Sequence, residues 1–376
     1  MRPALLLLLA ACGGPSDELA ADAHEASCDD ELDDDHDGRV DCNDFDCASS
    51  AACGGTGDTE EPPGDDTDAA PGDDTDAGGR EDVVVIAGNA STDLLLVVDN
   101  SASATDGQER LAAQIAPLLT VLTTSGVPWH VGVVTTDTDD LSQNGKLQGA
   151  DGYTWLDGTV AAPLPILQDM VRVGGDGSSS SRGRRAAHRA ITQPTAAHQR
   201  ANAGFLQGGA MHLLVLSNGV DASGSDPTSA DFISLLQAWT GGPVSFSSLV
   251  GPAGGCADAE SGSDYLAISA ALGGTTASYC DADWGPALIE VANRATGVPD
   301  RYPLSGEPDP DTLRPFILDG AARFDGQDAS RGDPCDTPIC FTYVYEAAPP
   351  RFGIRVTGLR PRAGAELHLP WDPPGP

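Results

Sequence analysis

Residues 93–103, Asp-Leu-Leu-Leu-Val-Val-Asp-Asn-Ser-Ala-Ser, determine our expectation for the fold. The apolar run Leu94 to Val98 has the length of a strand that is buried on both faces of a sheet. Asp99 follows the run directly, and Ser101 and Ser103 come next at alternate positions. In α/β folds, ligands bind beyond the carboxyl ends of the strands, so these three polar side chains are candidates for a binding site.

Further apolar runs alternate with segments of helical period after residue 103. The runs are Val131–Val134, Leu213–Leu216 and Val244–Val250. The helical faces are Leu111, Ile115, Leu118 and Leu122 after Asp106, and Phe232, Leu235, Leu236 and Trp239 after Asp226. This alternation predicts an α/β fold with a mostly parallel central sheet covered by helices.

Residues 89 to 298 resemble the von Willebrand factor A domain. The resemblance depends on the Asp-x-Ser-x-Ser motif at Asp99, on the segment Val131–Asp137 and on the strand end Leu213–Asp221. It implies a Rossmann-like, doubly wound domain with a metal-ion-dependent adhesion site. By this resemblance Asp99 holds the metal directly or through water, and Ser101 and Ser103 ligate it through their hydroxyls.

The other ligands expected from the resemblance are altered in this chain. Ser217-Asn218 stands where the family has an Asp; Asn218 offers an uncharged carbonyl oxygen, and the nearest carboxylate is Asp221. The loop Gly174–Ser178 presents Asp176 where the family supplies a Thr. Either Asp176 replaces the missing charge and Mg²⁺ or Mn²⁺ binds, leaving a position for an acidic side chain of a protein partner, or the site no longer binds metal. We expect the serines of residues 178–181 to lie on a solvated loop before a helix.

The beginning of the chain predicts export and lipid attachment. Met1-Arg2, the apolar run Leu5–Leu9 and the ending Leu-Ala-Ala-Cys12 resemble a bacterial lipoprotein signal, with residues 1–11 removed and Cys12 lipidated. An ordinary secretory signal is the alternative. The run is too short for a membrane-spanning helix. We therefore expect a protein that is anchored by lipid in the cell envelope, at the outer membrane or the cell surface, through a tether of residues 12–27.

Eight cysteines remain when Cys12 is set aside, and an even number is typical of disulfide pairing in an oxidising compartment. They are Cys28, Cys42, Cys47, Cys53, Cys256, Cys280, Cys335 and Cys340. Their clustering predicts two disulfides of undetermined connectivity within 28–53, one between Cys256 and Cys280, and one between Cys335 and Cys340. Lipid-anchored A-domain proteins of Gram-negative bacteria, which the chain resembles as a whole, also have the pair equivalent to Cys256 and Cys280.

Residues 28–53 form a small Cys- and Asp-rich module. The candidate Ca²⁺ ligands have calcium-loop spacing around Gly38: Asp33, Asp35, Asp37, Arg39 through its backbone carbonyl, Asp41 and Asp44. The module resembles calcium-type repeats of Gram-negative surface proteins; an acidic stalk that binds ions only loosely is the alternative. Residues 54–82, with a repeated Pro-Gly-Asp-Asp-Thr-Asp-Ala, are predicted to be an acidic disordered linker.

Charge and composition limit the possible functions. The formal net charge of -37 excludes a nucleic-acid binder that neutralises phosphates. The sequence has no His-Glu-x-x-His and no Gly-x-Ser-x-Gly, so we predict that it is not an enzyme. We divide the rest of the chain into an A-like domain, 83–298, and a small β-rich region, 299–376. The predicted function is cation-dependent protein binding or adhesion by a lipid-anchored envelope protein; a metal-independent structural or assembly scaffold is the alternative.

Overall fold

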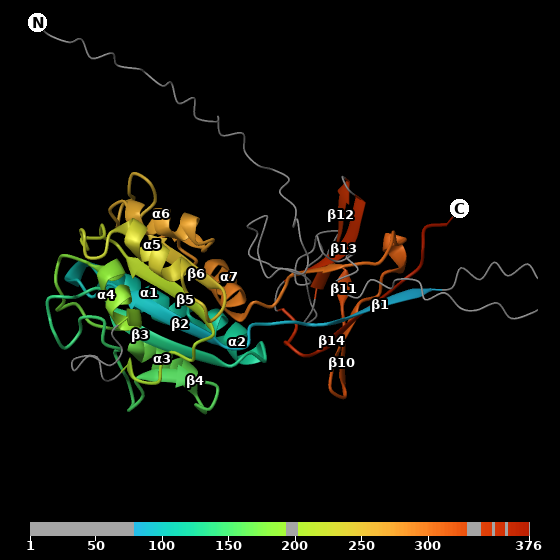
Figure 1. Cartoon of the computed structure of the whole chain (residues 1–376), viewed down its shortest axis with the longest axis horizontal. Helices are drawn as coiled ribbons and strands as arrows, with labels where there is room; N and C mark the ends of the chain where they lie inside the picture. Colours follow the sequence, from blue (N-terminus) through green and yellow to red (C-terminus); the bar gives the residue numbers. More distant parts are fainter. Residues whose placement is uncertain (1–78, 193–201, 329–339, 348–349, 358–359, 376) are drawn as a thin grey trace, which may run out of the picture. The chain divides into compact units, whose positions relative to one another are not determined.

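A computed structural model of the chain describes residues 79–192, 202–328, 340–347, 350–357 and 360–375 (Figure 1). Its central sheet has the strand order β4-β3-β2-β5-β6-β7. The strands are β2 (Thr92–Val98), β3 (Trp129–Thr135), β4 (Trp155–Asp157), β5 (Ala210–Ser217), β6 (Val244–Val250) and β7 (Thr276–Ser278). Neighbouring strands are parallel except β3 and β4, which are antiparallel. The predicted α/β fold with a mostly parallel sheet is therefore confirmed.

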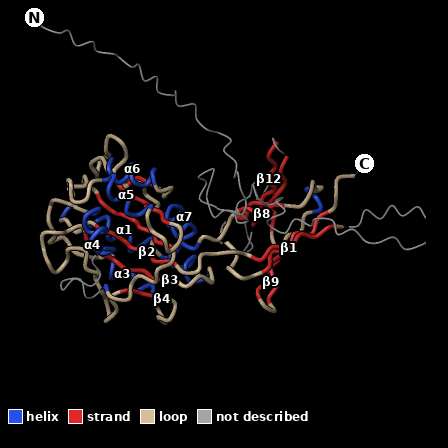
Figure 2. The backbone as a smooth tube through the Cα atoms, in the orientation of Figure 1, coloured by secondary structure: helices blue, strands red, loops and turns tan. Residues whose placement is uncertain are grey.

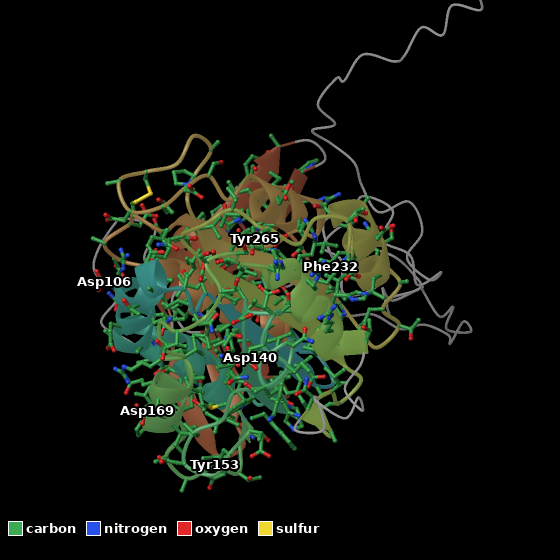
Figure 3. All side chains as sticks on the ribbon, turned by 90° about the vertical axis from the view of Figure 1, so that its left-hand side faces the viewer. Asp106, Asp140, Tyr153, Asp169, Phe232 and Tyr265 are labelled. Carbon is green, nitrogen blue, oxygen red and sulfur yellow. A yellow bond between two sulfur atoms is a disulfide. The ribbon has the colours of Figure 1, made fainter. Side chains whose placement is uncertain are left out.

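Within the part of the chain that the structure describes, seven helices cover the two faces of this sheet. They are α1 (Thr105–Gln114), α2 (Ala116–Thr124), α3 (Pro163–Met170), α4 (Gly183–Thr192), α5 (Ser229–Gln237), α6 (Ser263–Ala271) and α7 (Gly285–Thr296). Leu94, Leu96 and Val98 pack with α1, α2, α3 and α7, whereas Leu95 and Val97 pack with α4, α5 and α6. Successive side chains of a strand point to opposite faces, so a run that is apolar throughout fills both layers. Figure 3 shows Asp106 on α1 and Phe232 on α5 on opposite sides of the domain.

The predicted helical face after Asp106 is divided between two helices. Leu111 lies in α1, Ile115 between the helices, and Leu118 and Leu122 in α2. Pro117 in the first turn of α2 has no N–H to continue the hydrogen-bond ladder of α1. The four apolar side chains nevertheless share one core cluster, so the periodicity identified the buried face but not the break.

The remaining strands form two four-stranded sheets. One has the order β1-β14-β9-β10, with β1 (Arg80–Val85), β14 (Glu366–Trp371), β9 (Phe316–Asp319) and β10 (Ala322–Asp325). The other has the order β11-β12-β13-β8, with β11 (Gln327–Asp328), β12 (Cys340–Ala347), β13 (Pro350–Thr357) and β8 (Arg301–Pro303). Figure 2 shows helices grouped around the central sheet, while the segments with β8, β9 and β12 are mainly strand and loop.

The strand β1 corrects the domain boundary expected at residue 83. It pairs antiparallel with β14, from Arg80 opposite Trp371 to Val85 opposite Glu366. Residues 80–85 therefore belong to the β-rich region, and the α/β domain is inserted in the chain between β1 and β8. The boundary could not be found from local sequence because the partner strand lies near the other end of the chain.

Several predicted features lie outside the described residues. They are the signal peptide, Cys12, the cysteines Cys28, Cys42, Cys47 and Cys53, the predicted Ca²⁺ ligands of residues 33–44, the linker before residue 79, and Cys335. Within the described ranges, no helix combines the length and the apolar composition that crossing a membrane requires.

Candidate functional site

The carboxylate of Asp99 lies at the centre of a ring of hydroxyl groups. Asp99 follows β2 and is 0% exposed. Its Oδ2 accepts hydrogen bonds from the hydroxyls of Ser181 and Ser217, both at 2.6 Å. Its Oδ1 accepts one from the backbone N–H of Ser101 at 2.9 Å and one from the hydroxyl of Thr136 at 3.5 Å. Four separate segments of the chain thus supply donors to one buried carboxylate.

The parallel sheet explains why these segments meet. Asp99 N–H donates to the Leu216 carbonyl at 2.9 Å, and Thr136 N–H donates to the Val98 carbonyl at 3.1 Å, so β3 and β5 flank β2 up to their carboxyl ends. Ser217 is the last residue of β5. The chain leaves β2 to form β3 on one side and returns to form β5 on the other, and crevices at such switch points are ligand sites in open α/β sheets.

Three side-chain oxygens lead from this carboxylate toward solvent. Ser101 Oγ and Ser103 Oγ are 3.3 Å apart, and the Ser103 hydroxyl donates to Asn218 Oδ1 at 3.4 Å. The side-chain amide of Asn218 donates to the backbone carbonyl of Ser103 at 2.9 Å. The backbone carbonyl of Asn218 accepts a hydrogen bond from the backbone N–H of Glu260 at 2.8 Å. Ser101 is buried and Ser103 is exposed, so the site opens to solvent at Ser103.

The structure corrects the predicted contribution of Asp221. Its carboxylate accepts a hydrogen bond from the Ser223 hydroxyl at 2.6 Å and pairs with the buried Arg184 guanidinium at 3.0 Å. Burial raises the pKa of Asp221, and the Ser223 hydrogen bond and the Arg184 charge oppose this rise. Because Asp221 neutralises Arg184, its charge is committed to a cluster beside the site.

Asp176 also does not join the Asp99 cluster. It is exposed on the loop after Gly174, and no hydrogen bond among the described residues links it to Asp99, Ser101 or Ser103. Of the six metal ligands that the sequence predicts for this domain, the structure therefore brings together Asp99, Ser101, Ser103 and Asn218.

Sequence reasoning missed the roles of Ser181, Ser217 and Thr136. The expectation of a solvated loop for residues 178–181 is wrong at Ser181, which is 3% exposed and faces Asp99. The signal that could have identified Ser217 and Thr136 was their position at the ends of apolar runs, where parallel strands converge. Ser181 had no comparable signal, because three other serines precede it.

A second acidic cluster lies next to the ring. Ser178 N–H donates to Asp137 Oδ2, and the Ser178 hydroxyl donates to Asp139 Oδ2, both at 3.0 Å. Arg182 forms an ion pair with Asp139. The hydrogen bonds that Arg182 and Ser178 donate to Asp139 lower the pKa of its carboxyl group. Arg182 N–H also donates to the Thr136 carbonyl at 3.0 Å. The charge of Arg182 is therefore balanced beside the site.

Buried amides fix the loops that carry the site. Gln108 donates to the Asp99 carbonyl at 2.8 Å and to the Gly174 carbonyl at 2.7 Å. Gly177 N–H donates to the Asn100 carbonyl at 2.9 Å, and a Cβ at Gly177 would lie 2.2 Å from the Asn100 amide nitrogen. A larger residue would have to displace the Asn100 side chain, so glycine favours the close approach of this loop to the Asp-x-Ser-x-Ser segment.

The structure joins Cys256 and Cys280 by a disulfide, the pairing that the sequence predicts. The bond fixes the loop after β6, which also carries Glu260 and its backbone contact to Asn218. Cys340 is disulfide-bonded as well.

The donors at Asp99 are chemically suited to a hard divalent cation. The described residues contain no group of three or more His, Cys, Asp or Glu side chains that could hold a metal ion. Around Asp99, however, the oxygen atoms that could bind a metal ion belong to one carboxylate and several neutral side chains. Mg²⁺ and similar ions prefer oxygen ligands, keep several waters and are often bound by one or two carboxylates. The donor set therefore fits such an ion by ligand type and supplies a single negative charge.

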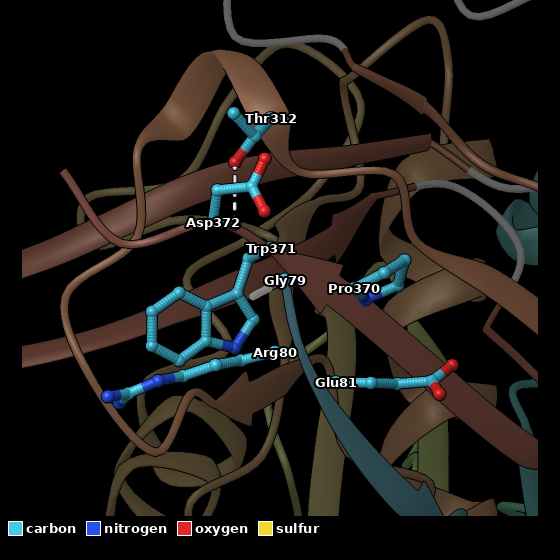
Figure 4. Close-up of a pocket in the computed structure, with 7 residues that line it drawn as sticks. All are labelled: Gly79, Arg80, Glu81, Thr312, Pro370, Trp371 and Asp372. Carbon is cyan, nitrogen blue, oxygen red and sulfur yellow. Dashed lines mark hydrogen bonds between the residues drawn. The ribbon is translucent and has the colours of Figure 1, made fainter. Parts of the chain in front are cut away.

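A separate hollow of about 360 Å³ lies in the β-rich region (Figure 4). It is lined by Gly79, Arg80, Glu81, Thr312, Pro370, Trp371 and Asp372. The Arg80 guanidinium lies 5.2 Å from the centre of the Trp371 ring, and Asp372 N–H donates to the Thr312 hydroxyl at 2.9 Å. Arg80 and Trp371 thus form a cation–π contact with each other.

No protein-family model matches the chain, and no curated protein matches it. Similar solved structures include a von Willebrand factor type A protein from Catenulispora acidiphila, with 16% identity, a TM-score of 0.34, and coverage of 79% of this chain and 66% of that one. Proximal thread matrix protein 1 from the mussel byssus has 12% identity and a TM-score of 0.34, with coverage of 58% of this chain and 50% of that one. The pilus adhesin SpaC from Lactobacillus rhamnosus GG has 11% identity and a TM-score of 0.37, with coverage of 75% of this chain and 38% of that one. The chain spans less than two thirds of the length of each.

Proposed function

We propose that the α/β domain is an A-like protein-binding module that holds a hard divalent cation, Mg²⁺ or Mn²⁺, at Asp99, Ser101 and Ser103. Ser181, Ser217 and Asn218 orient and complete this site. The observation that carries the proposal is the fully buried Asp99 carboxylate, which is ringed by hydroxyls and opens to solvent at the exposed Ser103.

The charge of the site favours an acidic side chain as the partner's contact. When bound, a divalent cation supplies a positive centre with an open coordination position. Asp99 is the only carboxylate among the residues proposed to hold the ion, and the nearby Asp221 and Asp139 are paired with Arg184 and Arg182. A carboxylate of the partner then balances the remaining positive charge. Ser103, at the exposed end, lies where this carboxylate would approach.

The second candidate function is a metal-independent structural or assembly scaffold. Ser181 and Ser217 already satisfy Asp99 Oδ2, and Asn218 contributes no charge. A carboxylate that is fully hydrogen-bonded by its own chain stabilises the converging loops without any ion.

The cellular setting of either function is inferred from the sequence pattern. We propose that lipid at Cys12 attaches the protein to the membrane of the cell envelope, at the outer membrane or cell surface. The module at 28–53 would hold Ca²⁺, and the acidic linker would separate the binding domain from the membrane. A role as a binding module rather than an enzyme agrees with the absence of hydrolase motifs from the sequence.

Mn²⁺ titration of the full chain tests the proposed cation site. Thermal unfolding and calorimetry should compare the wild type with Asp99→Asn and with Asp106→Asn, a change of equal charge at an exposed residue of α1. We expect Mn²⁺ to stabilise the wild type and Asp106→Asn. Asp99→Asn should lose about tenfold or more in affinity for the domain's site, since it removes the only carboxylate.

The N-terminal Asp-rich segment is present in all three proteins, so its own ion binding cancels in the comparison. Equal Mn²⁺ responses of all three proteins would refute the cation site at Asp99 and favour the scaffold.

A further inference from the structure

Asn218 is followed by Gly219, and this dipeptide lies inside the Asp99 site. An Asn-Gly sequence can lose ammonia because the Gly backbone nitrogen attacks the Asn side-chain carbon Cγ and closes a five-membered succinimide. Water then opens the ring to give Asp or isoaspartate. Glycine permits this closure because no Cβ hinders the backbone. We propose that Asn218 deamidates spontaneously in the folded protein and so adds a second carboxylate to the site.

The nucleophile of this reaction is connected to a carboxylate. Gly219 N–H donates to Ser217 Oγ at 3.2 Å, and the Ser217 hydroxyl donates to Asp99 Oδ2 at 2.6 Å. As the Gly219 nitrogen bonds to Asn218 Cγ, its proton passes to Ser217 Oγ, and the Ser217 hydroxyl releases its own proton in exchange. A positioned base of this kind accelerates attack by a weak nucleophile.

The electrophile is polarised by the same site. The Ser103 hydroxyl donates to Asn218 Oδ1 at 3.4 Å, which stabilises negative charge on that oxygen as the nitrogen attacks. The side-chain nitrogen then leaves as ammonia and carries the proton that the Gly219 nitrogen gave up. One water hydrolyses the ring, so that Asn and water are converted to Asp or isoaspartate and ammonia.

Steric conditions at Gly219 also permit the reaction. A Cβ built at this glycine would lie 3.8 Å from its nearest neighbour, Ser181 Oγ, so no atom crowds the side of Gly219 where a side chain would stand. Asn218 is half-buried at the end of β5, where water reaches the ring.

The second Asn-Gly dipeptide of the chain, Asn144-Gly145, provides an internal control. Asn144 is 4% exposed, and its Oδ1 accepts a hydrogen bond from the Arg189 guanidinium. Asn202 donates to the Gly145 carbonyl at 2.7 Å. Asn144 is more deeply buried than Asn218, and this limits the access of water to a succinimide ring there, so Asn144 should persist while Asn218 converts.

The consequence for cation binding rests on the proposed function. In the Asp form, an oxygen replaces the Asn218 nitrogen that now donates to the Ser103 carbonyl at 2.9 Å. Two acceptors would then face each other without a proton between them. A cation that binds the new carboxylate relieves this repulsion, and the second negative charge attracts it. Conversion of Asn218 to Asp therefore increases the affinity of the site for the ion.

Peptide mass spectrometry of the full chain over time at neutral pH tests the modification. We expect Asn218 to convert about tenfold or more faster than Asn144 in the folded protein, and faster than Asn218 does in urea. Ser217→Ala should slow the conversion of Asn218 without changing Asn144. Conversion of Asn218 no faster in the folded protein than in urea, or equal rates for the two dipeptides, would overturn the proposal.

Mn²⁺ titration of Asn218→Asp separates this inference from the proposed function. We expect an affinity about tenfold higher than that of freshly prepared wild type. If Asp99→Asn abolishes Mn²⁺ binding while Asn218 stays unmodified, the cation site stands and the deamidation fails. If Asn218 converts but neither Asp99→Asn nor Asn218→Asp changes Mn²⁺ binding, the modification stands and the cation site fails.

Discussion

Two aspartates at opposite ends of the strand β2 are equally buried but have different partners. Asp93 and Asp99 are both 0% exposed. Asp93 accepts hydrogen bonds from the Gln207 backbone N–H at 2.7 Å and from the Gln207 side-chain amide at 3.0 Å, and His130 Nδ1 lies 3.8 Å away. Asp99 is bound mainly by serine and threonine hydroxyls. Burial and residue type therefore do not distinguish the candidate site from a structural carboxylate.

The chemistry of the partners does distinguish them. An amide N–H can only donate, whereas a hydroxyl can turn its hydrogen away and offer a lone pair to a cation. Burial raises the pKa of Asp93, and the Gln207 hydrogen bonds oppose this rise, so these donors serve only to compensate the buried carboxylate. The surroundings of Asp99 can either hydrogen-bond it or share an ion with it. We infer that the amino end of the strand is a closed structural region and the carboxyl end an adaptable one.

Substitution of Asp93 should give the largest loss of stability. Asp93→Ala removes the buried, charged acceptor of two hydrogen bonds from Gln207, and we expect a loss of about 3 kcal/mol in the free energy of unfolding. Urea denaturation in the presence of EDTA measures this loss. The Mn²⁺ affinity of the folded protein should be unchanged.

The matched variant Gln207→Ala removes the side-chain donor but keeps the backbone N–H, so it should destabilise the protein less than Asp93→Ala. A loss of Mn²⁺ affinity in Asp93→Ala without a loss of stability would contradict the division into a structural and an adaptable end.

The fold could be predicted where the signal is local. The runs at Leu94–Val98 and Leu213–Leu216 are apolar throughout because both faces of the central sheet are covered, and a short window contains this information. The strand β1 could not be placed in this way. Its pairing with β14 joins Arg80 to Trp371, and Val83 and Val85 are exposed on its outer side. Non-local pairing of a half-exposed strand leaves no local pattern that specifies its partner.

The site could be predicted where it follows a strand directly. Asp99, Ser101 and Ser103 were identified because their motif begins at the end of β2. Asp221 was wrongly assigned because its sequence position near a strand end does not show that the buried Arg184 pairs with it. Ser181 was missed because only the path of the loop before α4 brings its hydroxyl to Asp99. Side-chain direction in loops depends on such tertiary contacts.

Acidification should affect His212 at the closed end of the sheet. His212 lies opposite Leu94, and burial lowers its pKa to about 3. Between this value and the unfolded value near 6.5, the unfolded chain binds a proton that the folded protein does not, so stability falls as pH falls. Between pH 6.5 and 5 we expect the wild type to lose about 2 kcal/mol relative to His212→Gln.

Urea denaturation of both proteins across this pH range isolates the effect of His212. The raised pKa values of Asp93 and Asp221 increase the stability of the folded protein as the pH falls. Both proteins contain these two residues, so this contribution cancels in the difference between them. His188→Gln, at a half-exposed histidine, should give a smaller difference, because burial lowers the pKa of His188 less completely. A pH-independent difference between the wild type and His212→Gln would show that this end of the sheet is accessible to water.

The smallest effect should come from single serines and tests the role of hydroxyl partners directly. Ser181 donates to Asp99 at 2.6 Å, whereas Ser269 donates to the Tyr265 carbonyl at 3.0 Å within the core, and both are buried. Ser181→Ala and Ser269→Ala should each lower the free energy of unfolding by about 1 kcal/mol. Only Ser181→Ala should also weaken Mn²⁺ binding, by several-fold. Equal weakening in both variants would assign the effect to overall stability, and the hydroxyl ring would then have the same structural role as the amides around Asp93.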